Sequence, residues 1–201
     1  MKERPILFTS EMVQAILGGR KTQTRREFKL KHCNKKMTWA NEPYSIVNDA
    51  NFKSQITGEI FIPKNAYGLV GDILWARETW CKHKGSYLYK ADGIDVNGFR
   101  WKPSIHMPKE ACRLRLKIKS IRVERLMDIS EQDAIAEGVR QRFGGFINYA
   151  NPSNLFTETY PFLSRKYSAA QMSYLSLWEK INGENSFEEN PWVWVIEFER
   201  A

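Results

Sequence analysis

A basic motif near the N-terminus holds the side chains of this sequence that are best suited to chemistry. Residues 19–26 read GRKTQTRR, so one lysine, three arginines and two threonines lie within eight positions. Clustered lysine and arginine side chains hold polyanions. The motif also sets an amine, Lys21, close to a hydroxyl, Thr24, and an amine can activate a hydroxyl as a nucleophile. Two kinds of chemistry, anion binding and nucleophilic attack, are therefore open to it.

A helix and a glycine turn must position this motif. Thr9-Ser10 offers an N-cap, the apolar residues of 12–17 share one helical face, and Gly18-Gly19 provides the end. The motif then begins just past a helix C-terminus. If it continues as an extended strand, Lys21 and Thr24 point to opposite faces. A catalytic pairing of these two residues therefore requires a turn or bulge between them.

The remaining patterns predict short strands mixed with a few helices. We expect strands at 5–8, 73–76, 87–89, 112–124 and 192–199, and helices at 130–138 and 168–183. A parallel βαβ rhythm is absent. We therefore predict an α+β fold in one domain, 1–201: a mostly antiparallel β-barrel with short flanking helices and two long insertions, at about 27–66 and 140–167.

The strand at 112–124 has one apolar and one cationic face. Its basic row contains Arg113, Arg115, Lys117 and Lys119, and either a solvated face or a ligand-facing one fits this pattern. The apolar phase shifts by one position further on, which predicts a bulge or bend near Ser120. Among the aromatic residues, Trp80, Tyr89 and Trp101 are candidates to stack on a base.

The composition favours a polyanionic or nucleoside partner. The net charge is +8, and the 3 cysteines and 3 histidines are scattered, so we expect reduced thiols and neither a metal nor another cofactor. No apolar run is long enough for a membrane span, and a signal peptide is not expected. These features predict a cytoplasmic protein, treated as a monomer, that does not act at a membrane.

Several segments together resemble the ASCH family, whose small β-barrel is similar to PUA domains. The resemblance rests on the helix Ser10–Gly18, on the GRKTQTRR motif, and on segments 71–79, 103–108, 130–138 and 190–195. It covers the chain apart from the two insertions, and the longer phage- and prophage-type members are the most similar. It implies the cytoplasm of a bacterium or of a phage-infected host.

The resemblance also implies an activity. Compact bacterial members are similar to N4-acetylcytidine amidohydrolases, whose lysine, threonine and glutamate fall here on Lys21, Thr24 and Glu137. Glu131, Asp133 and Glu78 are rivals for the glutamate. The residues expected to contact a nucleoside or nucleic acid, RNA rather than DNA, are Arg20, Arg25, Arg26, Arg77, Glu78, His106, Arg113 and Arg115.

Each catalytic candidate also has a non-catalytic interpretation. Lys21 fits a phosphate clamp, Thr24 a strand threonine that caps a backbone group, and Glu137 a solvent-facing residue in a last helical turn. Two alternatives to amide hydrolysis follow. The first is a non-catalytic RNA- or DNA-binding module, and the second is a metal-independent ribonuclease in which Lys21 and Arg26 stabilise developing charge.

Overall fold

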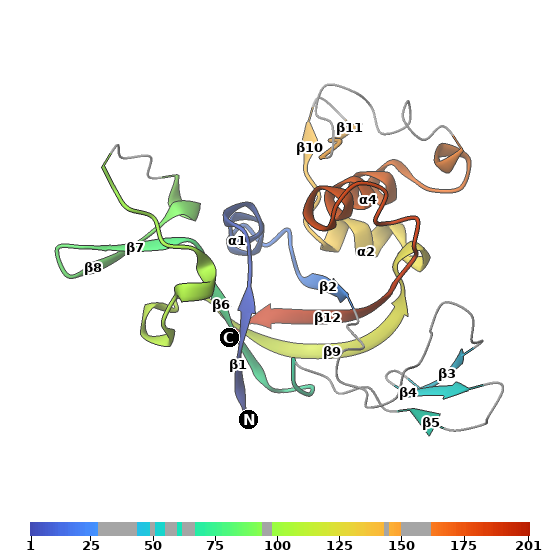
Figure 1. Ribbon diagram of the computed structural model, residues 1–201, viewed down its shortest axis with the longest axis horizontal. Helices are drawn as coiled ribbons and strands as arrows, with labels where there is room; N and C mark the ends of the chain where they lie inside the picture. The colour runs from blue at the N-terminus through green and yellow to red at the C-terminus, as the bar shows by residue number, and fades with distance from the viewer. Residues whose placement is uncertain are drawn as a thin grey trace.

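The computed structural model describes residues 1–27, 44–48, 51–54, 60–61, 67–93, 98–142, 145–149 and 162–201. Its centre is a five-stranded sheet in the order β1-β6-β9-β12-β2 (Figure 1). The strands are β1 (Glu3–Leu7), β2 (Gln23–Glu27), β6 (Ile73–Arg77), β9 (Arg115–Arg125) and β12 (Trp192–Arg200). β1 pairs with β6 in parallel, and the other three pairings are antiparallel.

The prediction of a mixed α+β fold is confirmed, but the described strands do not close into a barrel. β1 and β2 stand at the two ends of the strand order, and no pairing joins them in the described part of the chain. The parallel β1–β6 pairing explains part of the difference. Hydrophobic alternation predicts a strand and its buried face, but it does not tell which strands pair or in which direction.

In the described part of the chain, three α-helices lie against the sheet, and their ends follow the predicted caps. α1 (Ser10–Leu17) is capped by Thr9, α2 (Glu131–Ala136) by Ser130, and α4 (Ala169–Asn182) by the capping box of Ser168 and Gln171. In the part of the chain that the structure describes, no helix is both long and apolar enough to cross a membrane.

β12 lies between two hydrophobic clusters, because its side chains alternate between the faces of the sheet. Val193 and Val195 pack in a cluster with α4, whereas Trp194 and Ile196 pack in a cluster with α1. Figure 1 shows α1 and the α2–α4 pair at different places along the sheet. The sheet therefore separates a face covered by α1 from a face covered by α4, and β2 forms one edge between these two layers.

The predicted irregularity in the cationic strand is confirmed. Along β9, the pairing with β12 passes from Glu197↔Ser120 to Phe198↔Ile118, so one extra β9 residue, Lys119, is accommodated there. This shift changes which residues of β9 face the core, as the sequence pattern requires.

Smaller elements surround the sheet. β7 (Trp80–His83) and β8 (Ser86–Tyr89) form a hairpin that extends from the main sheet at the left of Figure 1. The prolines of segment 101–108 predict an extended loop, but the segment contains a 3₁₀ turn at Ser104–His106. The insertions hold β3 (Tyr44–Asn48), β4 (Asn51–Ser54), β5 (Ile60–Phe61), β10 (Gln141–Arg142) and β11 (Gly145–Phe146). The hairpin expected around 58–62 falls largely outside the described residues.

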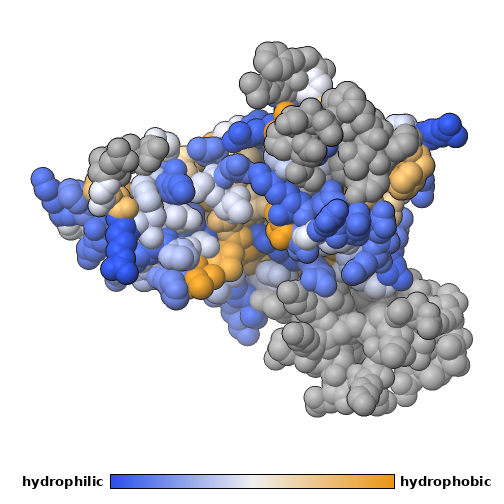
Figure 2. Space-filling model, turned by 45° about the horizontal axis from the view of Figure 1, so that its top comes forward, coloured by the Kyte–Doolittle hydropathy of each residue, from blue (hydrophilic) through white to orange (hydrophobic). Residues whose placement is uncertain are grey.

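The surface is mostly hydrophilic on the face drawn in Figure 2. Outside the grey atoms, one hydrophobic area lies near the middle of that face, and blue residues surround it. A monomeric protein normally exposes apolar patches of a few hundred Å².

Candidate active site

The turn between α1 and β2 fixes the position of Lys21. α1 ends at Gly18, and Gly19 adopts a φ of +73°, which glycine reaches at little cost. The backbone amides of Arg20 and Lys21 then both donate to the carbonyl of Ala15, at 2.9 and 3.1 Å. Thr22 donates in turn to the carbonyl of Ala136 in α2, at 2.9 Å. The turn thus brings the motif against the end of α2 before β2 begins.

Lys21 and Glu137 are brought together at this point. An isolated antiparallel bridge joins their backbones, and Lys21 Nζ lies 2.7 Å from Glu137 Oε2 and 2.9 Å from the Glu137 carbonyl oxygen. Lys21 is 2% exposed and Glu137 is 4% exposed. The interpretation of Glu137 as a solvent-facing residue is therefore wrong. Burial lowers the pKa of Lys21, although the adjacent Glu137 carboxylate opposes that shift.

A glycine makes this contact possible. Gly138 follows Glu137 with a φ of +85°, and a Cβ placed there would lie 2.9 Å from the Cβ of Lys21 and 3.1 Å from that of Ala15. A side chain at this position would push the end of α2 away from Lys21. The sequence showed Gly138 only as a helix end, because the close approach depends on a residue more than a hundred positions away.

Arg25 holds the other side of the Glu137 carboxylate. Its guanidinium donates to Glu137 Oε1 at 3.2 Å, to Asp133 Oδ2 at 3.0 Å and to Glu124. Burial tends to lower the pKa of Arg25, but its carboxylate partners outweigh this effect, so the pKa is raised. The guanidinium also lies 5.7 Å from the centre of the Tyr174 ring. Arg25 therefore positions the candidate carboxylate, and its expected contact with a ligand remains a prediction.

Further ion pairs extend this cluster toward solvent. Arg122 contacts Asp133 at 2.8 Å, Glu124 at 3.3 Å and Glu197. We call the group of Lys21, Arg25, Arg122, Glu124, Asp133, Glu137 and Glu197 the charge network. Three cations face four carboxylates in it, so its formal charge is −1 despite the basic motif from which it grows.

Thr24 points away from this network along the strand. It pairs with Ile196, which packs in the α1 cluster, whereas the neighbouring Arg25 pairs with Val195, which packs in the α4 cluster. Thr24 is 1% exposed. The predicted alternation of the two faces therefore holds within β2, and Lys21 lies before the strand rather than in it.

A small pocket nevertheless brings Thr24 and Glu137 to one space. This pocket, the edge pocket, has a volume of about 60 Å³ and is lined by Thr24, Arg25, Glu137, Tyr174 and residues of α1 and α4. A water molecule takes about 30 Å³ in the liquid, so the edge pocket has room for a small group and not for a base.

A larger pocket adjoins the edge pocket. This outer pocket, of about 550 Å³, shares Met12, Arg26 and Ile181 with the edge pocket and extends to Phe8, Lys90 and Ser104. Arg26 NH2 donates to the Leu7 carbonyl at 2.5 Å, and its guanidinium lies 5.3 Å from the centre of the Phe8 ring. The two pockets together offer space for a flat group with a small substituent.

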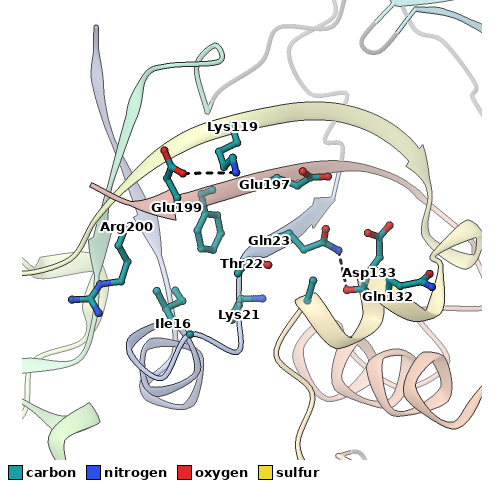
Figure 3. Close-up of a pocket in the computed structure, with 13 residues that line it drawn as sticks. Ile16, Lys21, Thr22, Gln23, Lys119, Gln132, Asp133, Glu197, Glu199 and Arg200 are labelled. Atoms are coloured by element: carbon teal, nitrogen blue, oxygen red, sulfur yellow. Dashed lines mark hydrogen bonds and ion pairs between the residues drawn. The ribbon is translucent and has the colours of Figure 1, made fainter.

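A third pocket lies at the other end of the Lys21–Glu137 contact (Figure 3). This third pocket, of about 600 Å³, has as many cations as carboxylates in its lining, which includes Lys21, Lys119, Arg200, Asp133, Glu197 and Glu199. Figure 3 shows the Lys21 side chain pointing from the start of β2 toward α2, and Gln23 Nε2 donates to the Asp133 carbonyl at 2.9 Å. Thr24 and Glu137 do not line this pocket, so it is less suited to the predicted chemistry although it is the largest of the three.

The other predicted contact residues are spread over the molecule. Arg20 donates to the Gly138 carbonyl at 3.3 Å, and Arg77 to the Met107 carbonyl at 3.1 Å. Glu78 is buried and accepts both arms of Arg113, at 2.9 and 3.0 Å, so it does not complete the site with Lys21. Arg115 contacts Glu3 at 3.3 Å, and His106 is exposed. Their expected contacts with a ligand remain predictions.

Sequence reasoning missed the partners of the network rather than its centre. Glu124, Arg122 and Tyr174 were not among the candidates, because no periodic pattern connects them with the motif.

Among the described residues, no group of three or more His, Cys, Asp or Glu side chains is arranged to hold a metal ion. No family model, curated protein or solved structure matches the chain.

Proposed function

We propose that this chain is an ASCH-type, PUA-like amidohydrolase that removes the acyl group from N4-acetylated cytidine. One observation carries the proposal: the buried Lys21–Glu137 contact adjoins a pocket that is also lined by Thr24. The Glu137 carboxylate and the Thr24 hydroxyl therefore line one small space, and the Lys21 amine contacts that carboxylate. Such a combination is the general arrangement of an activated nucleophile.

The pocket sizes support a nucleoside with a small acyl substituent. The acyl group would enter the edge pocket, and the base and sugar would occupy the outer pocket, next to Phe8 and Arg26. An aromatic ring and a guanidinium both offer flat faces to a base.

The proposed reaction has two stages. Thr24 Oγ1 attacks the acyl carbon, its proton passes to neutral Lys21, the C–N bond breaks, and the exocyclic amine takes the proton as it leaves. Water then attacks the acyl-threonine ester, and cytidine, acetate and the free enzyme result. Glu137 accepts a hydrogen bond from Lys21 throughout, and Arg25 fixes the orientation of that carboxylate.

The pocket sizes, rather than the charges, favour this chemistry over phosphodiester cleavage. The network has four carboxylates and three cations, but the third pocket is lined by as many cations as carboxylates. The edge pocket, by contrast, has room for a small acyl group and not for a larger one. The ribonuclease alternative therefore has less support than amide hydrolysis.

The test is hydrolysis of N4-acetylcytidine by the purified protein, with cytidine measured chromatographically. Lys21→Met should lower kcat by about 10²-fold or more, which is the range for the loss of an acid–base group. Thr24→Val keeps the shape of the side chain without its hydroxyl and should have a similar effect, whereas Thr24→Ser should retain activity.

Two outcomes would contradict the proposal. Unchanged N4-acetylcytidine after incubation with the folded wild-type protein would remove the activity itself. Full activity of Thr24→Val, together with an inactive Lys21→Met, would show that Thr24 is not the nucleophile. The nucleophile would then be a water molecule activated by Lys21.

A further inference from the structure

A second cation-rich surface lies on the β7–β8 hairpin, outside the pockets described above. The hairpin turns through Lys84 and Gly85, both with positive φ, and segment 98–102 joins it through the Trp80↔Lys102 bridge. We call the surface formed by Lys82, His83, Lys84, Phe99, Arg100, Trp101 and Lys102 the hairpin surface. Figure 1 shows the hairpin extending away from the five-stranded sheet.

Three rings follow one another across this surface. The rings of His83 and Phe99 have centres 4.9 Å apart, and those of Phe99 and Trp101 have centres 6.2 Å apart. Phe99 and Trp101 are half-buried, and His83 is exposed. A partly exposed row of rings offers successive stacking positions for flat groups, whatever their hydrogen-bonding edges.

The cations around these rings lack carboxylate partners. Lys82, Lys84, Arg100 and Lys102 are exposed, and none of them forms an ion pair within the described part of the chain. Lys82 lies instead 5.3 Å from the centre of the Tyr87 ring, and Lys102 lies 5.0 Å from that of Trp80.

Two carboxylates of the described residues beside this surface are already engaged. Glu110 accepts a hydrogen bond from Tyr87, and Asp92 pairs with Arg113 at 2.7 Å. They do not neutralise the four exposed cations. The hairpin surface is therefore positively charged and aromatic at once.

We propose that the hairpin surface binds single-stranded nucleic acid. Unpaired cations attract the phosphates, and the row from His83 to Trp101 receives unstacked bases, which a duplex cannot offer. An acidic protein would use the charges but not the stacking positions, so the combination of both favours a single strand.

The surface also suggests the form of the substrate, a step that rests on the proposed function. Thr79 and Lys90, which flank the hairpin and are joined by a backbone hydrogen bond of 3.0 Å, also line the outer pocket. A strand on the hairpin surface could therefore continue into the outer pocket. The acylated cytidine would then be a residue of a single-stranded RNA rather than a free nucleoside.

The experiment measures binding of fluorescent single-stranded oligouridine to the full chain by anisotropy, over a series of salt concentrations. The variant Lys82→Gln, Arg100→Gln, Lys102→Gln should weaken binding and lower the salt slope by about one for each lost phosphate contact. Phe99→Leu with Trp101→Leu should weaken binding without changing that slope. A duplex of the same length should bind more weakly than the single strand.

A matched variant separates local contacts from net charge. Lys109→Gln, Lys117→Gln, Lys166→Gln removes three exposed cations from other places and should bind as the wild type does. Circular dichroism of all variants checks their folding. The proposal would be overturned by an equal loss of binding in both triple variants, or by wild-type binding of the hairpin variant. Equal affinity for duplex and single strand would also overturn it. So would binding to anionic phosphatidylserine vesicles without binding to oligouridine.

Failure of this inference is distinguishable from failure of the proposed function. Lys21→Met should bind oligouridine as the wild type does, since Lys21 lies outside the hairpin surface. A wild-type protein that binds oligouridine but leaves N4-acetylcytidine intact, both as the free nucleoside and within a single-stranded RNA, would contradict the proposed reaction alone. One that hydrolyses the nucleoside without binding the strand would contradict the hairpin surface alone.

Discussion

The charge network and the hairpin surface are both rich in cations, but they use them in opposite ways. In the network, Lys21 and Arg25 are buried and each faces at least one carboxylate. On the hairpin surface, the lysines and Arg100 are exposed and face rings or solvent. Buried charges need partners, whereas exposed charges stay available to a ligand. The same residue types therefore position a site in one region and offer binding contacts in the other.

Replacing one arginine in each region gives the sharpest test of this contrast. Arg25→Met should lower the free energy of unfolding by about 3 kcal/mol, because it leaves three carboxylates without their shared buried cation. This is the lower end of the usual range, since Glu124 and Asp133 keep some contact with solvent. Urea unfolding measures the change.

The matched substitution is Arg100→Met on the hairpin surface. It removes an exposed arginine that has no ion pair among the described residues, so the free energy of unfolding should change by about 0.5 kcal/mol or less. Similar losses in Arg25→Met and Arg100→Met would show that burial and pairing do not distinguish the two regions.

A pair of glycines tests the packing that brings Lys21 to Glu137. Gly138→Ala places a Cβ against Lys21 and Ala15, whereas Gly85→Ala, in the hairpin turn, has nothing within 4 Å of the new atom. The two glycines have φ values of +84° and +85°, so the backbone strain that an alanine introduces is the same at both positions. We expect Gly138→Ala to lose about 2 kcal/mol more than Gly85→Ala in urea unfolding, which is the usual scale of overpacking. Equal losses would mean that the close approach at Gly138 is not tightly packed.

The sequence allowed much of the local structure to be predicted. The caps of α1, α2 and α4, the strand at the C-terminus and the bulge near Ser120 all follow from short-range patterns, and the structure confirms them. Lys21 and Glu137 were named together because of a family resemblance. Spacing alone could not have paired residues that lie 116 positions apart.

The missed features depend on long-range packing. The row of Arg113, Arg115 and Lys119 gave a choice between a solvated and a ligand-facing surface, but each of these residues contacts a carboxylate from another segment. The role of Arg25 changed for the same reason. A cation in a sequence has no visible partner until the fold brings a carboxylate to it, so the sequence could not show these ion pairs.

The pH dependence of activity tests whether burial has changed the chemistry of Lys21. Burial disfavours the charged ammonium and lowers its pKa, and Glu137 only partly opposes this. As the proposed base, Lys21 must be neutral before Thr24 can give up its proton. The kcat/KM for N4-acetylcytidine should therefore fall about tenfold per unit as the pH drops below that pKa, and should level off before the usual lysine range is reached. Lys21→Arg should lose this limb, because arginine stays charged throughout. A profile that keeps rising through the usual lysine range would mean that burial does not prepare Lys21 to act as the base.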